Sequence, residues 1–229
     1  MTWERNLLVS TLKLTKLGPV QEDLIRKDAQ TPREITEKTL KKLCNEGLIQ
    51  REPQIIEASL NQRVKIAIQA IKLGADFEKV CSFLDWGEFE NIAAVAFEAN
   101  HFVVKRGFRF TGSGRRWEID ILGLKESVVA CVDCKHWHHG WRSAATMKAV
   151  EAQVKRTEAL ANALPMLHEK IGLANWKETT LIPIILSLYP SPLKFYKKTP
   201  IVPILQLQNF LSEFLAYTNQ LTHFFPPIF

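Results

Sequence analysis

The chain has 229 residues, of which 46% are hydrophobic and 24% charged, with 30 Lys and Arg against 24 Asp and Glu. This composition excludes collagen-like, coiled-coil and wholly disordered proteins. No apolar run is long enough for a transmembrane helix, and the charged amino-terminal segment is unlike a secretory signal. Four cysteines are too few for a disulfide framework in a chain of this length, which favours a reducing, cytoplasmic compartment. The net charge of +6 is compatible with a polyanionic partner without requiring one.

Residues 1–58 are predicted to form three helices and two short strands. The helices are expected over 3–17, 21–27 and 32–45, and the strands over 48–51 and 54–56. The third helix has the residues of a capping box, with Thr31 as N-cap, Pro32 at the first helical position and Glu34 at the third. Gly47 is expected to end that helix.

This order of elements resembles a winged helix, whose third helix enters a DNA groove. The resemblance makes Arg33, Lys38, Lys41 and Lys42 candidate contacts to phosphates or bases. Residues 1–86 hold 14 basic and 12 acidic side chains, so this part of the chain has little net charge. A solvated helix face is therefore an alternative, as is a module directed at RNA or protein. Residues 59–86 are predicted to be a helical linker.

From residue 87 onward the pattern is that of an α/β domain. A helix is expected over 88–100, a flexible turn over 111–114 and strands over 117–124 and 128–137. The short connection between the two strands predicts an antiparallel hairpin. Side chains alternate along a strand, so Asp133 and Lys135 share one face. Asp120 and Asp133 are separated by an odd number of positions, so they are expected to lie opposite or diagonal to each other on that face.

Two carboxylates and one ammonium are therefore predicted to converge. Two carboxylates about 4 Å apart repel by about 4 kcal/mol at an effective dielectric constant of about 20, so a positive charge must offset them. One interpretation is a structural ion pair with Lys135. The other is a divalent cation held by Asp120 and Asp133, with Lys135 beside a reacting phosphate.

The ordered set of motifs resembles the PD-(D/E)xK nuclease superfamily, and within it the Mrr-type restriction endonucleases and archaeal Holliday-junction resolvases. The similarity covers about residues 87–206 and rests on four matches: Phe89-Glu90 at the start of the first core helix, Asp120 within a hydrophobic strand, Asp133-Cys134-Lys135 as the (D/E)xK signature, and Gln153 on the following helix. Two positions depart from the family pattern. Ile119 replaces the proline, and Asp133 stands where most of these relatives have glutamate.

The resemblance implies a restriction-endonuclease-like core over 87–229, with a mixed central sheet flanked by helices, preceded by the small winged-helix-like α+β module. It also implies a cytoplasmic, homodimeric, Mg²⁺-dependent endonuclease that hydrolyses DNA phosphodiester bonds without contacting a membrane, with Mn²⁺ as a substitute metal. The implied metal ligands are Asp120, Asp133 and Glu90. Lys135 would stabilise the developing negative charge, and Gln153 would hold the attacking water or a phosphate oxygen.

Two of these implications have simpler alternatives. Glu90 is also explained as a carboxylate that the helix macrodipole favours near a helix start. The whole chain is also explained as a non-catalytic DNA-binding protein that retains a nuclease-like scaffold.

Basic and aromatic residues on either side of the acids are candidate DNA contacts. Residues 105–116 contain five basic side chains and no acid, as a phosphate-binding segment requires, namely Lys105, Arg106, Arg109, Arg115 and Arg116. A solvated hairpin is the alternative. Trp137, His138 and Arg142 are further candidates, whereas zinc is not expected because no Cys and His set completes a tetrahedral site.

The remaining elements are predicted from apolar runs. A helix is expected over 143–163, strands over 181–188 and 201–205, and a closing helix over 207–221. The strands are continuously apolar, as in a sheet covered on both faces. Cys131 and Cys134 lie three apart on a strand, hence on opposite faces, and are expected to be packing residues. The apolar tail 224–229 is a candidate dimer contact.

Overall fold

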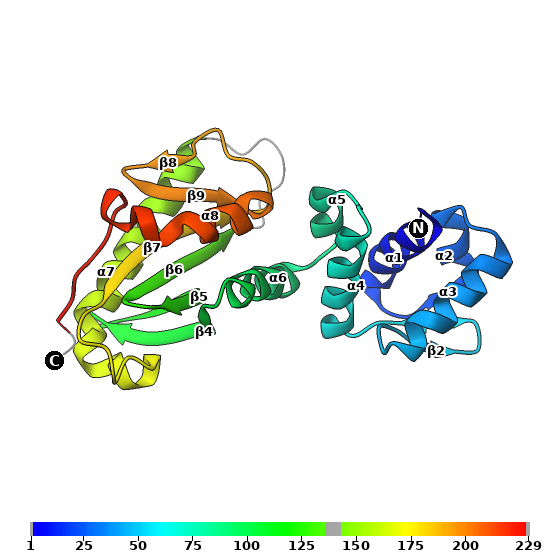
Figure 1. Ribbon diagram of the computed structural model, residues 1–229, viewed down its shortest axis with the longest axis horizontal. Helices are drawn as coiled ribbons and strands as arrows, with labels where there is room; N and C mark the ends of the chain where they lie inside the picture. Colours follow the sequence, from blue (N-terminus) through cyan, green and yellow to red (C-terminus); the bar gives the residue numbers. More distant parts are fainter. Residues whose placement is uncertain (1, 136–142, 228–229) are drawn as a thin grey trace. The chain divides into compact units, whose positions relative to one another are not determined.

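The computed structural model describes residues 2–135 and 143–227 of the chain, which divide into two compact units between Ile92 and Ala93 (Figure 1). The predicted contacts Trp137, His138 and Arg142 lie outside the described residues. No helix among the described residues is both long and apolar enough to cross a membrane.

The first unit is mainly helical and carries a three-stranded antiparallel sheet with the order β1-β3-β2. Its elements are α1 (Thr2–Leu14), η1 (Thr15–Leu17), β1 (Val20–Gln21), α2 (Glu22–Ala29), α3 (Arg33–Asn45), β2 (Gln50–Glu52), β3 (Ile55–Glu57), α4 (Leu60–Lys72), α5 (Phe77–Ser82) and the start of α6 (Trp86–Ala99). The predicted helices and strands of this region are present. Strand β1 was not predicted, because two residues are too few to show a β period.

The capping box predicted for α3 is wrong. Pro32 is the N-cap and makes no side-chain cap hydrogen bond. The Thr31 and Thr36 hydroxyls are buried and lie 2.7 Å apart, so Thr31 satisfies its hydroxyl inside the unit instead of capping the helix. A capping box is found at α4, where the side chains of Ser59 and Gln62 each accept a hydrogen bond from the other residue's backbone N–H.

The second unit is an α/β structure built on a six-stranded mixed sheet with the order β4-β5-β6-β7-β9-β8. Neighbours β6, β7 and β9 run parallel, and the remaining pairs are antiparallel. The strands are β4 (Val103–Gly112), β5 (Arg115–Lys125), β6 (Val128–Lys135), β7 (Thr180–Ser187), β8 (Phe195–Tyr196) and β9 (Thr199–Pro203), with helices α7 (Ser143–Ile171), η2 (Ile204–Gln206), α8 (Leu207–Glu213) and η3 (Phe214–Gln220). The expected α/β class, with a mixed sheet flanked by helices, is confirmed.

Adjacent residues of β5 show that helices cover both faces of this sheet. Leu122 packs into a buried core that includes Leu160 of α7. Its neighbour Gly123 faces the other way, where an added Cβ would lie 2.6 Å from Phe97 of α6. Helices α7 and α8 accordingly lie on opposite sides of the sheet in Figure 1.

Two hairpins place the candidate acids within the sheet. β4 and β5 pair from Val103–Leu124 to Gly112–Arg115, so the predicted flexible turn narrows to Ser113 and Gly114, both at positive φ. β5 and β6 pair from Lys125–Val128 to Ile121–Val132, which confirms the predicted antiparallel hairpin. The loop that joins the two strands has two residues.

The carboxyl-terminal segment differs from its prediction in two respects. The helix expected over 207–221 is α-helical only to Glu213 and continues as the 3₁₀ helix η3, whose Phe214 is buried against Phe102 and Phe210. The tail returns to the sheet, because Phe224 exchanges two backbone hydrogen bonds with Leu181 at 2.9 and 3.0 Å. Phe224 therefore packs within its own chain.

Candidate functional site

Asp120 and Asp133 lie where β5 and β6 separate. The paired register ends at Ile121–Val132, and Asp120 and Asp133 are the next residue along each strand. In place of a continued ladder, the Cys134 N–H donates to Asp120 Oδ2 at 2.7 Å. The Asp120 carboxylate therefore supplies the acceptor that a main-chain carbonyl supplies elsewhere between these strands, and this bond fixes its position.

Asp133 is buried and pairs with two cations. Its side chain is 5% exposed, with Lys135 Nζ 2.7 Å from Oδ2 and Arg156 Nη1 2.7 Å from Oδ1. A buried carboxylate requires such partners, because desolvating an unpaired charge costs several kcal/mol. The predicted placement of Asp133 and Lys135 on one face is confirmed, and their ion pair is present.

Arg156 was not predicted, and its position depends on Gln153 one turn earlier in α7. Gln153 is fully buried and donates from Nε2 to the Cys131 carbonyl at 2.8 Å. Its Oε1 accepts a hydrogen bond from Arg156 Nη1 at 2.7 Å. Gln153 therefore connects α7 to β6 by a hydrogen bond and holds the Arg156 guanidinium beside Asp133. The i, i+3 spacing of Gln153 and Arg156 puts the two side chains on one face of α7.

The two carboxylates differ in their electrostatic surroundings. Burial raises the pKa of Asp120, and the nearby charge of Asp133 adds to this rise. The Cys134 N–H, Lys135 and Arg156 lower the pKa but do not cancel the effect. A positive charge placed beside Asp120 would therefore stabilise its carboxylate.

The donor chemistry fits a hard cation whose coordination is completed by water and phosphate. Mg²⁺ is commonly held by one or two carboxylates together with substrate oxygens and waters. The raised pKa of Asp120 is consistent with a site that gains from added positive charge. Within residues 2–135 and 143–227, no group of three or more His, Cys, Asp and Glu residues forms a complete protein-only metal site.

Glu90 belongs to the first unit, on α6. Its Oε1 accepts a hydrogen bond from Trp86 Nε1. The adjacent acid on this helix, Glu88, is buried in an ion pair with Arg63, at 2.6 Å, and also accepts the Asp85 N–H. Glu88 is thus a structural acid, and metal binding by Glu90 stays a prediction.

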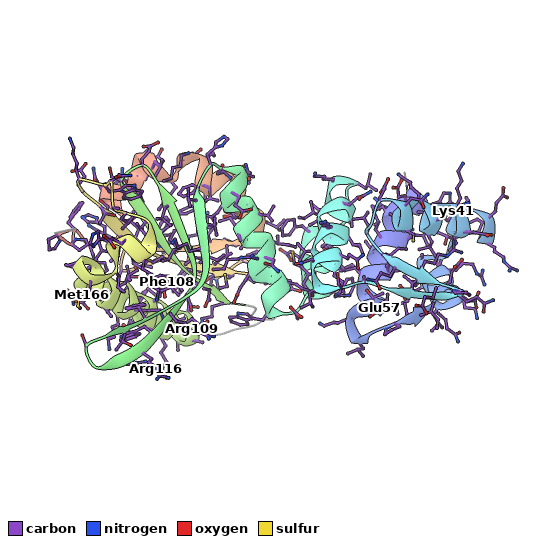
Figure 2. The ribbon with its side chains drawn as sticks, turned by 90° about the horizontal axis from the view of Figure 1, so that it is seen from below. Lys41, Glu57, Phe108, Arg109, Arg116 and Met166 are labelled. Atoms are coloured by element: carbon purple, nitrogen blue, oxygen red, sulfur yellow. The ribbon has the colours of Figure 1, made fainter. Side chains whose placement is uncertain are left out.

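The five basic residues of the β4–β5 hairpin have different partners. Arg109 pairs with Glu118 at 2.9 Å, the Arg115 guanidinium stacks on Trp117 with its Cζ 4.0 Å from the ring centroid, and Lys105 donates to the Lys170 carbonyl. Arg106 and Arg116 are exposed. Figure 2 shows Arg109 and Arg116 on this hairpin, where they line a pocket of about 630 Å³ with Lys170.

The predicted basic residues of α3 are all exposed. Lys42 pairs with Glu4 at 2.8 Å, and this hydrogen bond raises the pKa of its ammonium. Lys41 points away from the body of its unit (Figure 2). Arg33, Lys38 and Lys41 are therefore the more accessible cations of this helix.

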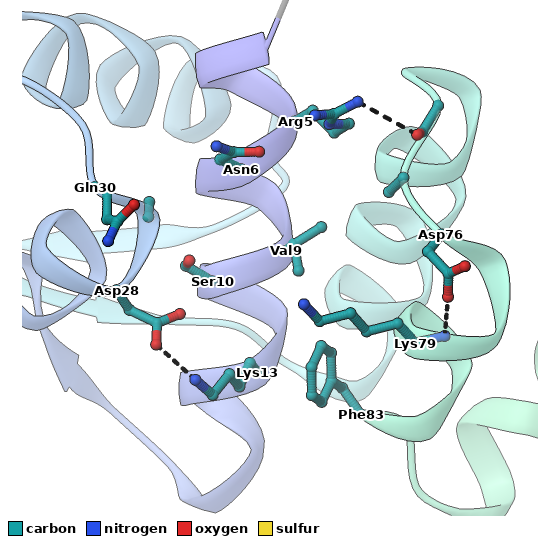
Figure 3. Close-up of a pocket in the computed structure, with 13 residues that line it drawn as sticks. Arg5, Asn6, Val9, Ser10, Lys13, Asp28, Gln30, Asp76, Lys79 and Phe83 are labelled. Atoms are coloured by element: carbon teal, nitrogen blue, oxygen red, sulfur yellow. Dashed lines mark hydrogen bonds and ion pairs between the residues drawn. The ribbon is translucent and has the colours of Figure 1, made fainter.

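A polar pocket of about 510 Å³ lies in the first unit between α1 and the segments around Asp28 and Asp76 (Figure 3). Lys13 pairs with Asp28 at 2.5 Å, and the Asp76 carboxylate caps the Lys79 backbone N–H at 2.6 Å. Arg5 donates to the Gly74 carbonyl at 3.5 Å. Because these charges contact groups of the same unit, the pocket does not indicate a ligand class.

Comparisons with known proteins give no activity. A scan against models of known families finds no match. An uncharacterized protein of Archaeoglobus fulgidus is 28% identical over 132 residues, which cover 58% of this chain and 93% of that protein. The crystal structure of protein VC1899 from Vibrio cholerae aligns over 96% of this chain at 11% identity, with a TM-score of 0.41. The chain spans about half (53%) of the length of that protein, and this similarity is too low to carry an argument.

Proposed function

We propose that this chain is a Mg²⁺-dependent endodeoxyribonuclease with a PD-(D/E)xK core over 87–229, preceded by a winged-helix-like module over 1–58 and a helical linker over 59–86. The observation that supports the proposal is the convergence of Asp120, Asp133 and Lys135 at the separating ends of β5 and β6. Two neighbouring acids beside an amine are the groups that metal-assisted phosphodiester hydrolysis requires.

Each side chain would have a distinct task. When bound, Mg²⁺ supplies a polarised phosphate oxygen and an activated water. Asp120 and Asp133 would hold the metal, with Mn²⁺ as a substitute, and Glu90 is the further candidate ligand. Lys135 would donate to the non-bridging oxygen on which negative charge develops. Because Gln153 is fully buried and bonded to Cys131, we assign it a positioning role instead of contact with the attacking water.

The proposed substrate is DNA, bound through its backbone. The exposed cations of the β4–β5 hairpin and of α3 would contact phosphates, so binding should weaken as salt concentration rises. A homodimeric state and a cytoplasmic location accompany this proposal as predictions.

One observation favours a second candidate function. Both oxygens of Asp133 are already paired with cations, and the described residues contain no third acid, His or Cys completing a metal group. A DNA-binding protein that retains the scaffold without cutting would have the same arrangement.

A cleavage assay separates the two candidates. We would incubate the protein with labelled linear and branched DNA in Mg²⁺, Mn²⁺ or EDTA, and compare Asp120→Asn with Glu158→Gln, which removes an exposed acid of α7. Metal-dependent cleavage that falls by at least about 100-fold in Asp120→Asn alone, with DNA binding retained, supports the nuclease. Binding without cleavage under every metal supports the non-catalytic protein.

A further inference from the structure

Arg156 occupies an oxygen that the proposed metal would need. Asp133 Oδ1 lies 2.7 Å from Arg156 Nη1, and Oδ2 lies 2.7 Å from Lys135 Nζ. The carboxylate is 5% exposed, so a cation approaching it has to take the place of one of these partners. Lys135 lies beside Asp133 on the same strand, β6, whereas Arg156 reaches Asp133 from α7.

The charges explain why the two cations would compete with a metal. Two ionised carboxylates and two cations sum to zero, so a divalent ion gains little net attraction while both ion pairs persist. A phosphodiester adds one negative charge and offers the guanidinium an oxygen acceptor as good as a carboxylate. If Arg156 pairs with that phosphate, Asp133 Oδ1 becomes available to the metal.

The surroundings of Arg156 suit such a transfer. Its side chain is 22% exposed, and its two hydrogen bonds within the described part of the chain both use Nη1. The base of the side chain is held by a rigid helix, since Gln153 and Thr157 on either side are buried and hydrogen-bonded to each other. The guanidinium can therefore change partner while α7 stays in place.

We infer that Arg156 couples metal binding to DNA binding: it pairs with Asp133 when no DNA is bound and moves to a backbone phosphate when DNA arrives, which opens Asp133 to the metal. This inference rests on the proposed nuclease function and adds a regulation of the same site. Coupling of this kind is reciprocal, so the metal also strengthens DNA binding by the same factor.

Direct metal titration tests the inference without measuring cleavage. Free Mn²⁺ is followed by electron paramagnetic resonance while it is added to the full chain, with and without a short phosphorothioate duplex that resists hydrolysis. The variants are Arg156→Gln, Arg156→Lys, and Lys155→Gln as the matched control, because Lys155 is an exposed cation one position earlier on the same helix. Circular dichroism checks that each variant is folded.

The wild type should bind Mn²⁺ weakly alone and on the order of tenfold more tightly with DNA. Arg156→Gln should bind Mn²⁺ tightly without DNA and gain little when DNA is added, whereas Lys155→Gln should behave as the wild type. Arg156→Lys keeps the charge but loses the guanidinium whose Nη1 reaches both Gln153 and Asp133, so its affinity should be intermediate. This variant serves as the test if Arg156→Gln does not fold.

The outcomes that contradict the inference are distinct from those that contradict the function. Equal Mn²⁺ affinity of Arg156→Gln and wild type without DNA, in a protein that still cuts DNA, overturns the coupling and leaves the nuclease standing. Absence of Mn²⁺ binding in every variant, with and without DNA, overturns the proposed function together with the coupling.

Discussion

The buried ion pair between Arg63 and Glu88 should control the stability of the first unit. Their side chains are 3% and 1% exposed, and Arg63 Nε lies 2.6 Å from Glu88 Oε1. Arg63 also donates to the carbonyls of Leu12 and Phe83 and to the Thr15 hydroxyl. One guanidinium thus joins α1, η1 and the end of α5 to the start of α6.

Glu88→Gln preserves the shape of this network and leaves the Arg63 charge buried without a counter-charge. Loss of one partner from a buried ion pair costs about 3–5 kcal/mol, a large part of the 5–15 kcal/mol that typically stabilises a domain. We expect about 3 kcal/mol, because the amide still accepts a hydrogen bond. At about 4–8 °C per kcal/mol for a domain of this size, the melting temperature should fall by about 12–24 °C.

Urea unfolding measures this loss, and amide hydrogen exchange of α4 assigns it to the first unit. The matched control is Glu22→Gln, which breaks an Arg–Glu pair of similar length in the same unit, with Arg51 at 2.8 Å. That pair is 24% and 19% exposed, so its loss should cost about 0–1 kcal/mol. Equal losses in the two variants would refute the reasoning, because burial would then not set the strength of these pairs.

Three further predictions concern Gly123, Asp120 and the reactivity of two cysteines. Gly123→Ala should destabilise the second unit by about 1–3 kcal/mol, measured by thermal unfolding, because its Cβ would lie 2.6 Å from a buried Phe97 ring carbon; an unchanged melting temperature would show that the ring moves freely. Burial raises the pKa of Asp120 in the folded protein above its ordinary 3.8. The Asp120 carboxyl group therefore makes its full contribution to the stability of the folded state below pH 3.8, and this contribution is lost as the pH rises through the raised pKa. Asp120→Asn should therefore melt at a higher temperature than the wild type near neutral pH, and the difference should shrink in acid; a constant difference would contradict the raised pKa. Burial also raises the pKa of the Cys131 thiol to about 12, so iodoacetamide should modify the partly exposed Cys44 first and Cys131 only after unfolding, as mass spectrometry of the peptides would show.

The sequence was sufficient to predict that Asp120, Asp133 and Lys135 converge, but not that α7 supplies a further partner for Asp133. Strand parity and a short loop determine which residues of a hairpin face each other, so the positions of Asp120, Asp133 and Lys135 followed from local pattern alone. Arg156 was not predicted, because tertiary packing decides which face of α7 lies against the sheet and no local sequence pattern encodes that packing. Gln153 was identified from the family resemblance, yet its burial and its bond to Cys131 could be known only from the structure.

Long-range contacts account for the other differences in the first unit. Thr31 has the chemistry of an N-cap, and only the tertiary packing that brings its hydroxyl to Thr36 shows why it does not serve as one. From the sequence, Glu88 cannot be told from an ordinary carboxylate at a helix start, because its ion-pair partner Arg63 lies far away in the chain. Strand β1 exists only because β3 offers it a partner.

The position of β4 at one end of the sheet order has a consequence for the solution behaviour of this protein. In the described part of the chain, this outer strand of ten residues pairs with another strand along one edge only, and a free strand edge can pair with a strand from another molecule and lead to aggregation. Lys105, Arg106 and Arg109 make that approach unfavourable, since two copies would bring like charges together. Variants that neutralise these residues to weaken DNA binding should therefore also be checked by light scattering, because self-association would imitate a loss of affinity.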